Sequence, residues 1–210
     1  MNTVDRLFKE ATGFHKTTCL LASKYSGVKY YDADAHLPFP ILYRGDDGVQ
    51  WRTVFKHDEA DEAWQEDADS YFSALIVNGA FSLELHLKHL YLLIEQKQVR
   101  GHDLHKLFQG LSKYTQTNLE YIFQTISASQ PFVQKSFDAL NQKLHVTRIW
   151  SIQTVLQESA RAFESWRYCF ENASQTSSFA GYGEAVYAMR IMSTQYKGQP
   201  DASADGPPQS

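Results

Sequence analysis

Four of the eight histidines, His86, His89, His102 and His105, lie within one stretch of twenty residues. They form two pairs with a spacing of three residues, the first in a strongly apolar segment and the second in the polar segment after it. Imidazole nitrogens bind transition metals, so the pairs could hold a metal ion if the chain folded back to bring them together. No cysteine or carboxylate stands at a spacing that obviously completes such a site. We therefore predict no metal site and no cofactor.

Arg100 and His105 could support a second kind of chemistry. An arginine fixed near a histidine can hold a phosphate while the imidazole moves a proton, which is the minimum needed for cleavage of RNA by its own 2′-hydroxyl. A structural interpretation is also open, in which His102 and Asp103 tie the turn together by hydrogen bonds while Arg100 is solvated. On the residues alone the structural interpretation is favoured, because an arginine and a histidine five positions apart arise by chance in many chains.

Positive charge surrounds the same segment, carried by Lys88, Lys97, Lys106 and Lys113. Lys88 follows Glu84 by four residues, in the order that favours an ion pair on a helix. Because cations attract phosphate groups, the candidate binding residues beside Arg100 and His105 are His102, Lys88 and Lys106.

Arg167 is a further candidate binding residue, between Trp166 and Tyr168 on the apolar face of a predicted helix. A buried guanidinium needs a carboxylate partner. Glu84, or Glu171 one turn further along, could supply it. An ion pair that ties two helices together is the favoured interpretation.

Composition limits the class of protein. The chain has 210 residues, 43% of them hydrophobic, which suits one domain with a sizeable core. The net charge of −4 argues against a protein that coats nucleic acid over its whole surface, but it allows a local basic face. Two cysteines, Cys19 and Cys169, are too few for a disulfide framework, and we expect both to be small buried side chains.

The spacing of apolar residues predicts the helices that position these side chains. A stripe that steps by three and four residues predicts a central helix over 75–94, with Ile76, Ala80, Leu83, Leu87 and Leu90 on one side. We place the acidic stretch 58–69 at the start of this helix, because the helix dipole favours negative charge there. Asp103 can cap a short helix after the turn. Further helices are expected over 3–24, 118–127, 132–144, 149–170 and 185–192.

Two β-prone runs flank a Gly/Asp turn and predict a small β-hairpin over about 39–55. The single helical domain is expected over 1–196, and the tail 197–210 is too polar to pack and is expected to be disordered. The N-terminus lacks the basic and then apolar pattern of a signal peptide. No apolar run reaches the length of a membrane span. We therefore expect a cytoplasmic protein that does not enter a membrane.

The middle of the chain resembles the HEPN domain family of helical bundles. The resemblance rests on Ala80-Phe-Ser-Leu-Glu-Leu-His-Leu-Lys88, then Gly101-His-Asp-Leu-His-Lys-Leu-Phe108, then the later run Phe163-Glu-Ser-Trp-Arg-Tyr168. It covers about 66–172. It implies an all-α fold, an up-and-down helical bundle to which this chain adds an N-terminal helix and the small β-hairpin.

The resemblance also implies a range of functions. HEPN domains are commonly dimeric and are associated with RNA cleavage, nucleotide binding, toxin–antitoxin pairs and antiviral defence. Catalytic members carry an arginine and a histidine four to six residues apart, a spacing that Arg100 and His105 satisfy. Here Gly101 follows the arginine where those members often have a polar residue, so we expect a non-catalytic module that binds RNA, a nucleotide or a partner protein. A metal-independent ribonuclease using Arg100 and His105 is the alternative.

Overall fold

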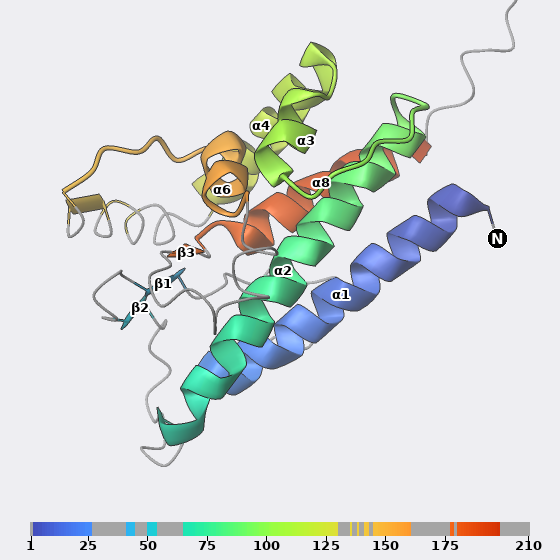
Figure 1. The fold of residues 1–210 in the computed structure, drawn as a ribbon. Helices are drawn as coiled ribbons and strands as arrows, with labels where there is room; N and C mark the ends of the chain where they lie inside the picture. Colours follow the sequence, from blue (N-terminus) through green and yellow to red (C-terminus); the bar gives the residue numbers. More distant parts are fainter. Residues whose placement is uncertain are drawn as a thin grey trace, which may run out of the picture.

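The computed structural model describes residues 2–26, 41–44, 50–53, 65–129, 135, 138, 141–142, 145–160, 177–178 and 180–197. Its elements, in chain order, are α1 (Thr3–Ser26), β1 (Ile41–Arg44), β2 (Gln50–Thr53), α2 (Gln65–Leu93), α3 (Leu104–Gln109), α4 (Lys113–Ala128), α6 (Ile152–Glu158), β3 (Ser177–Ser178) and α8 (Tyr182–Lys197). The chain is therefore largely helical, as the apolar spacing predicts (Figure 1).

Helix α2 forms the centre of the molecule, with α1 and α8 packed along it (Figure 1). Its residues are buried on several sides at once, including Leu75, Leu83, Leu87 and Leu90. Apolar contact with neighbouring helices removes this surface from water and supplies the main stabilising free energy. Helices α1 and α8 contribute buried side chains to the same core, among them Ala22 and Met189.

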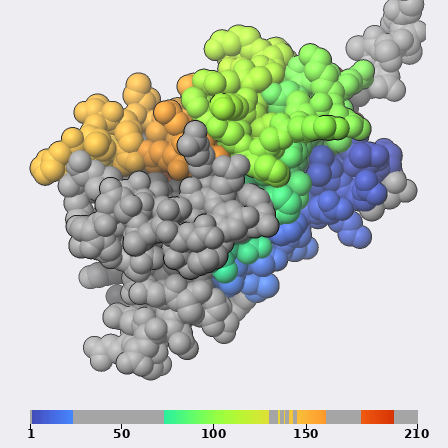
Figure 2. Space-filling model, in the orientation of Figure 1, coloured from blue at the N-terminus to red at the C-terminus, as the bar shows by residue number. Residues whose placement is uncertain are grey.

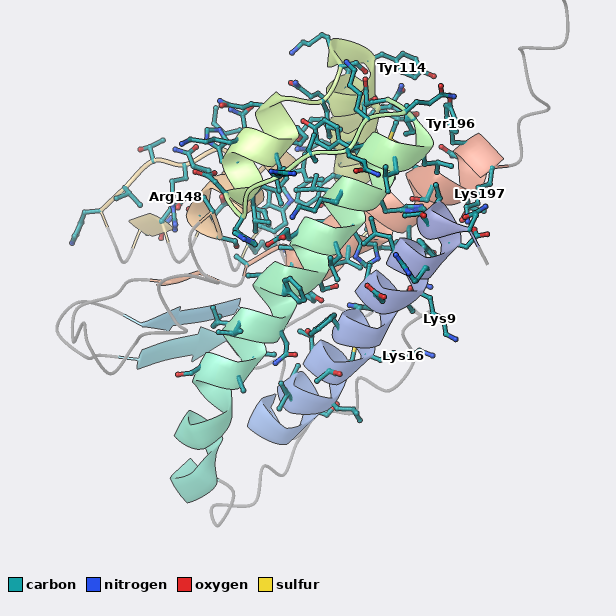
Figure 3. All side chains as sticks on the ribbon, turned by 45° about the vertical axis from the view of Figure 1, so that its right-hand side comes forward. Lys9, Lys16, Tyr114, Arg148, Tyr196 and Lys197 are labelled. Atoms are coloured by element: carbon teal, nitrogen blue, oxygen red, sulfur yellow. The ribbon has the colours of Figure 1, made fainter. Side chains whose placement is uncertain are left out.

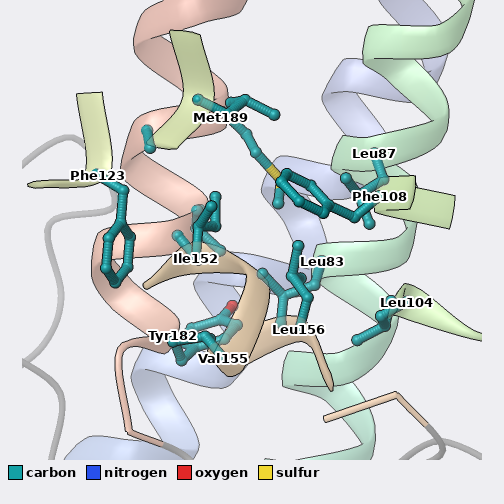
Figure 4. Packing of buried hydrophobic residues seen from close by; sticks show 14 of the residues in the cluster. Leu83, Leu87, Leu104, Phe108, Phe123, Ile152, Val155, Leu156, Tyr182 and Met189 are labelled. Carbon is teal, nitrogen blue, oxygen red and sulfur yellow. The ribbon is translucent and has the colours of Figure 1, made fainter. Parts of the chain in front are cut away.

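Helix α3 packs against α2, α4 packs against α8, and α6 packs against α3 and α4; each of these helices begins at a polar cap. Asp103 accepts a hydrogen bond from the Lys106 backbone N–H at 3.0 Å, as expected for the short helix. Serines do the same for α4 and α6, at Ser112 and Ser151. The apolar faces that these helices turn inward meet α2 and α8, and the labelled core side chains interdigitate there (Figure 4).

Within the residues that the structure describes, the predicted helix over 149–170 is wrong in two respects, its start and its continuity. Helix α6 starts three residues later, and the Ile149 side chain is 78% exposed. The helix ends at Glu158, and the Ala160 carbonyl leaves the helical ladder to accept a hydrogen bond from the Leu104 backbone N–H at 3.3 Å. This bond fixes the start of α3 against the end of α6, so the tertiary contact outweighs the helical pattern. Helices α4 and α8 are longer than the predicted segments 118–127 and 185–192.

Strands β1 and β2 pair antiparallel, with Ile41 opposite Thr53 and Arg44 opposite Gln50. The two-residue strand β3 pairs with β1, which gives the order β2-β1-β3. The turn expected at 45–48 lies outside the described residues. So do residues 198–210 of the predicted tail and most of the predicted helix 132–144. Among the helices that the structure describes, none has the length and apolar character needed to cross a membrane.

Two glycines allow a paired test of backbone constraints. Gly181 has φ +76°, and a Cβ there would lie 2.6 Å from Val155 Cγ2 and 2.8 Å from Trp150 Cη2. We expect Gly181→Ala to lower the free energy of unfolding by about 2–4 kcal/mol. Gly13 lies in α1 with open space around it, so Gly13→Ala should raise stability by about 0.5–1 kcal/mol. Denaturant titration measures the free energy of unfolding of both variants. A change in the same direction in both would contradict this account.

Candidate functional site

Glu84 is the buried anchor of the turn between α2 and α3. Its side chain is 2% exposed, and Oε1 accepts a hydrogen bond from Lys88 Nζ at 2.7 Å. Its second oxygen, Oε2, accepts one from His102 Nδ1 at 3.0 Å. The expected Glu84–Lys88 pair on α2 is therefore confirmed. A buried carboxylate without such donors would be costly, so the turn and the helix depend on each other.

The Glu84 carboxylate also orients the His102 ring. Because a carboxylate only accepts hydrogen bonds, Nδ1 of His102 carries a proton, and in the neutral ring Nε2 is then the basic nitrogen. The His102 side chain is 48% exposed, so the oriented imidazole lies at the surface. A carboxylate that fixes an imidazole in this way is the arrangement used for proton transfer and for orienting ligands. The sequence offered a signal for it in Glu84, a carboxylate within an apolar stripe.

The other predicted residues of the turn differ in exposure. Arg100 is exposed and makes no ion pair with any residue that the structure describes. Lys106 is also exposed, with Nζ 3.9 Å from Asp103 Oδ2. His105 is half-buried on α3, and its Nε2 is buried with no hydrogen-bond partner among the described residues. The turn thus presents Arg100, His102 and Lys106 to solvent, whereas His105 points partly inward. Arg167 and Cys169 lie outside the described residues.

The two histidine pairs do not converge. His86 Nδ1 donates to the Ser82 carbonyl oxygen at 2.8 Å, and His89 Nδ1 donates to the Val4 carbonyl oxygen of α1 at 3.2 Å. Both rings also contact Phe8 of α1. Within the described part of the chain, no group of three side chains could hold a metal ion. The first pair therefore joins α2 to α1.

Burial controls the charge of this first pair. It lowers the pKa of His86 to about 3 and that of His89 to about 4, below the 6.5 of a solvated imidazole. Both rings are neutral at pH 7, because a charged imidazole in the core would lose its hydration.

A second buried polar cluster joins α1 to α8. A hydrogen bond of 3.0 Å links His15 Nδ1 to the Tyr182 hydroxyl, and Cys19 Sγ lies 3.6 Å from His15 Nε2. Burial raises the pKa of Tyr182 and raises that of Glu184, in the first turn of α8, to about 7. His15, Tyr182 and Glu184 are all buried between the helices and lie away from the surface.

An open concavity of about 700 Å³ is lined by the segment 145–148 together with Asp138, Asn141 and Gln142. Arg148 is its strongest cation, and Figure 3 shows it on the side of the molecule opposite Tyr196. The guanidinium pairs with Glu158 and donates to Asn141 Oδ1 at 2.8 Å. Its charge is therefore already compensated, which makes the concavity a poorer candidate than the turn.

Replacing Glu84 tests the anchor. In Glu84→Gln, the neutral amide no longer compensates Lys88 and no longer requires the proton at Nδ1 of His102, so we expect a loss of about 1–3 kcal/mol in the free energy of unfolding. Nitrogen-15 NMR of the imidazole should show a smaller population of the Nδ1–H tautomer of His102. The exposed Glu10→Gln serves as control, with a change within about 0.5 kcal/mol. An unchanged tautomer in Glu84→Gln would contradict the assignment.

The buried pair predicts a pH dependence of stability. Between about pH 6.5 and pH 4 the unfolded chain binds protons on His86 and His89 that the folded chain excludes. The stabilisation that depends on these two neutral rings is therefore fully present above about pH 6.5 and is lost as the pH falls through the window. Glu184, whose pKa is raised to about 7, contributes with the opposite sign, so the histidine effect is read from the difference between variant and wild type. His86→Asn keeps a donor for the Ser82 carbonyl but cannot titrate. For each pH unit of acidification, its free energy of unfolding should therefore fall by about 1 kcal/mol less than that of the wild type. Denaturant titrations from pH 7 to pH 5 measure it, and a His86→Asn variant with the wild-type slope would contradict it.

Comparison of the chain with family models, with curated proteins and with solved structures returned no match. Relatives therefore supply no function that could be carried over to this chain. The geometry of the turn, with Glu84 beneath it and Arg100, His102 and Lys106 exposed on it, is the basis on which a function is argued.

Proposed function

We propose that this chain is a HEPN-like helical module that binds RNA at the α2–α3 turn, residues 95–103, and at the start of α3. The observation that carries the proposal is the pair of hydrogen bonds to the buried Glu84. They hold Lys88 and His102 in fixed positions at the base of a turn on which Arg100 is exposed. The fixed turn presents Arg100 and the oriented His102 at the surface, with Lys106 exposed at the start of α3, and such groups suit the regularly spaced phosphates of a nucleic acid.

The ligand is RNA rather than a free nucleotide or a partner protein because the charges are spread over an exposed loop. Arg100 and Lys106 extend from backbone that lies on the surface, where an extended polyanion can reach both. Protein interfaces, in contrast, tend to exclude lysine from their centre. The resemblance adds a homodimer to the proposal, with a bacterial defence or toxin–antitoxin context. Light scattering at micromolar concentration measures the assembly.

A metal-independent ribonuclease is the second candidate, and the Glu84–His102 hydrogen bond favours it. An imidazole whose Nδ1 proton is held by a carboxylate can use Nε2 as a base for the 2′-hydroxyl of RNA. The 2′-oxygen would attack the adjacent phosphorus, the bond to the 5′-oxygen would break, and water would protonate that leaving oxygen. Arg100 would stabilise the charge on the phosphorane. In this version His102 takes the part that the family pattern gives to His105.

An assay with labelled single-stranded RNA in the presence of EDTA tests both candidates. For binding, Arg100→Ala should weaken the complex and lower the slope of affinity against salt concentration by about one unit, because one phosphate contact is lost. Lys16→Ala removes an exposed cation on α1 and is the matched control, with an unchanged slope. A wild-type protein that binds no RNA at low salt would overturn the proposal.

Cleavage separates the two candidates in the same assay. A binding module leaves the RNA intact at any protein concentration. A ribonuclease produces 2′,3′-cyclic phosphate ends, and His102→Ala should abolish them. If cleavage were lost in His105→Ala and retained in His102→Ala, the catalytic histidine would be His105 and not His102.

A further inference from the structure

The start of α1 and the ends of α2 and α8 meet at one end of the bundle. Lys197 Nζ of α8 donates to Asp5 Oδ1 of α1 at 2.8 Å and lies 5.3 Å from the centre of the Phe8 ring. Glu95, just after α2, accepts hydrogen bonds from the Ser112 backbone N–H at 3.0 Å and from Thr115 Oγ1 at 2.7 Å, both at the start of α4. These contacts join the start of α1 to the end of α8 and the end of α2 to the start of α4, and the His89–Val4 hydrogen bond joins α2 to the start of α1. In Figure 2 the loop after α2 lies directly beside the first turns of α1.

Exposed cations gather at this end, which we call the basic end: Arg6, Lys9, Lys97, Lys113 and Lys197. The first four make no ion pair with the residues that the structure describes. Of the carboxylates nearby, Asp5 and Glu95 already accept hydrogen bonds from neighbouring side chains or backbone. The hydrogen bond from Lys197 lowers the pKa of Asp5. Burial would raise the pKa of Glu95, but hydrogen bonds from Ser112 and Thr115 outweigh it and lower the pKa. Glu10 is exposed on α1. The basic end therefore carries a positive excess within a chain whose net charge is −4.

Two tyrosines lie among these cations. Tyr114 is 67% exposed and follows Lys113, and Tyr196 is 36% exposed and precedes Lys197. Helices α4 and α8 pack against each other, and Figure 3 shows Tyr114 and Tyr196 on the same side of the molecule as Lys197. Tyrosine rings beside lysines suit a ligand with flat rings and negative charge, because the rings can stack on its bases while the lysines meet its anionic groups.

Single-stranded RNA has both properties, since its bases are free to stack and its backbone is anionic. Duplex RNA hides its bases, so only its phosphates could use such a surface. A protein partner would use the tyrosines but would leave the lysines uncompensated, and lysine is depleted at protein interfaces. The combination of rings and unpaired cations thus selects the single strand.

We propose that the basic end binds single-stranded RNA, with bases stacked on Tyr114 and Tyr196 and phosphates held by Arg6, Lys9, Lys97 and Lys113. Lys97 lies within the α2–α3 turn itself, so the basic end adjoins the turn and a strand bound at one continues onto the other. This inference rests on the proposed RNA-binding function and assigns it a second surface, with specificity for unpaired bases.

Fluorescence anisotropy with a labelled oligouridine and with an RNA duplex of equal length tests the inference. Base stacking on an aromatic side chain is large enough that Tyr114→Ala and Tyr196→Ala should each weaken oligouridine binding about fivefold or more, and leave duplex binding unchanged. Tyr121→Ala is the matched control, because this tyrosine is 71% exposed on the same helix but lies two turns away from the basic end. Circular dichroism confirms that the variants fold.

The outcomes separate this inference from the proposed function. If Arg100→Ala weakens binding and the Tyr114→Ala/Tyr196→Ala double variant does not, the inference is overturned while the turn keeps its function. If the double variant weakens binding and Arg100→Ala does not, the inference stands and the turn loses its part. Equal weakening by Tyr121→Ala, or equal loss of duplex binding, would also overturn it.

Discussion

Burial of α2 on several sides is the constraint on which the rest of the structure depends. A helix surrounded by other helices leaves no water for its polar side chains, so each of them needs a partner from a neighbouring element. Ser82 donates to the Ala11 carbonyl and His89 to the Val4 carbonyl, which fixes α1. Glu84 faces another direction and fixes the turn before α3. The same requirement that stabilises the core therefore also creates a fixed polar site at the surface, where Glu84 holds His102.

The different hydrogen-bond partners of these side chains explain why four similarly spaced histidines have different properties. His86 and His89 donate to backbone carbonyls and are neutral in the core, whereas His102 donates to a carboxylate and remains at the surface. His105 lies between these cases on α3. Residue type and spacing do not distinguish them, because the environment of each ring is set by the direction in which the helix presents it.

The sequence predicts the parts of the fold that depend on local rules. The apolar stripe over 75–94 and the cap at Asp103 are both confirmed, because helix period and capping act within a few residues. The end of α6 could not be predicted, since it depends on the Ala160 carbonyl meeting the Leu104 N–H. The Glu84–His102 hydrogen bond spans 18 residues and was missed for the same reason. At the site, the sequence identifies the turn and its exposed cations but not the carboxylate that orients the imidazole.

The contacts between the first and last described helices have a consequence for synthesis on the ribosome. His15 meets Tyr182 across 167 positions of the chain, and Asp5 meets Lys197 across 192. Helix α1 is synthesised well before α8, so the hydrogen bonds that join the two helices can form only after α8 has been translated. Contacts of such long range slow folding, so we expect α8 to complete this part of the core late.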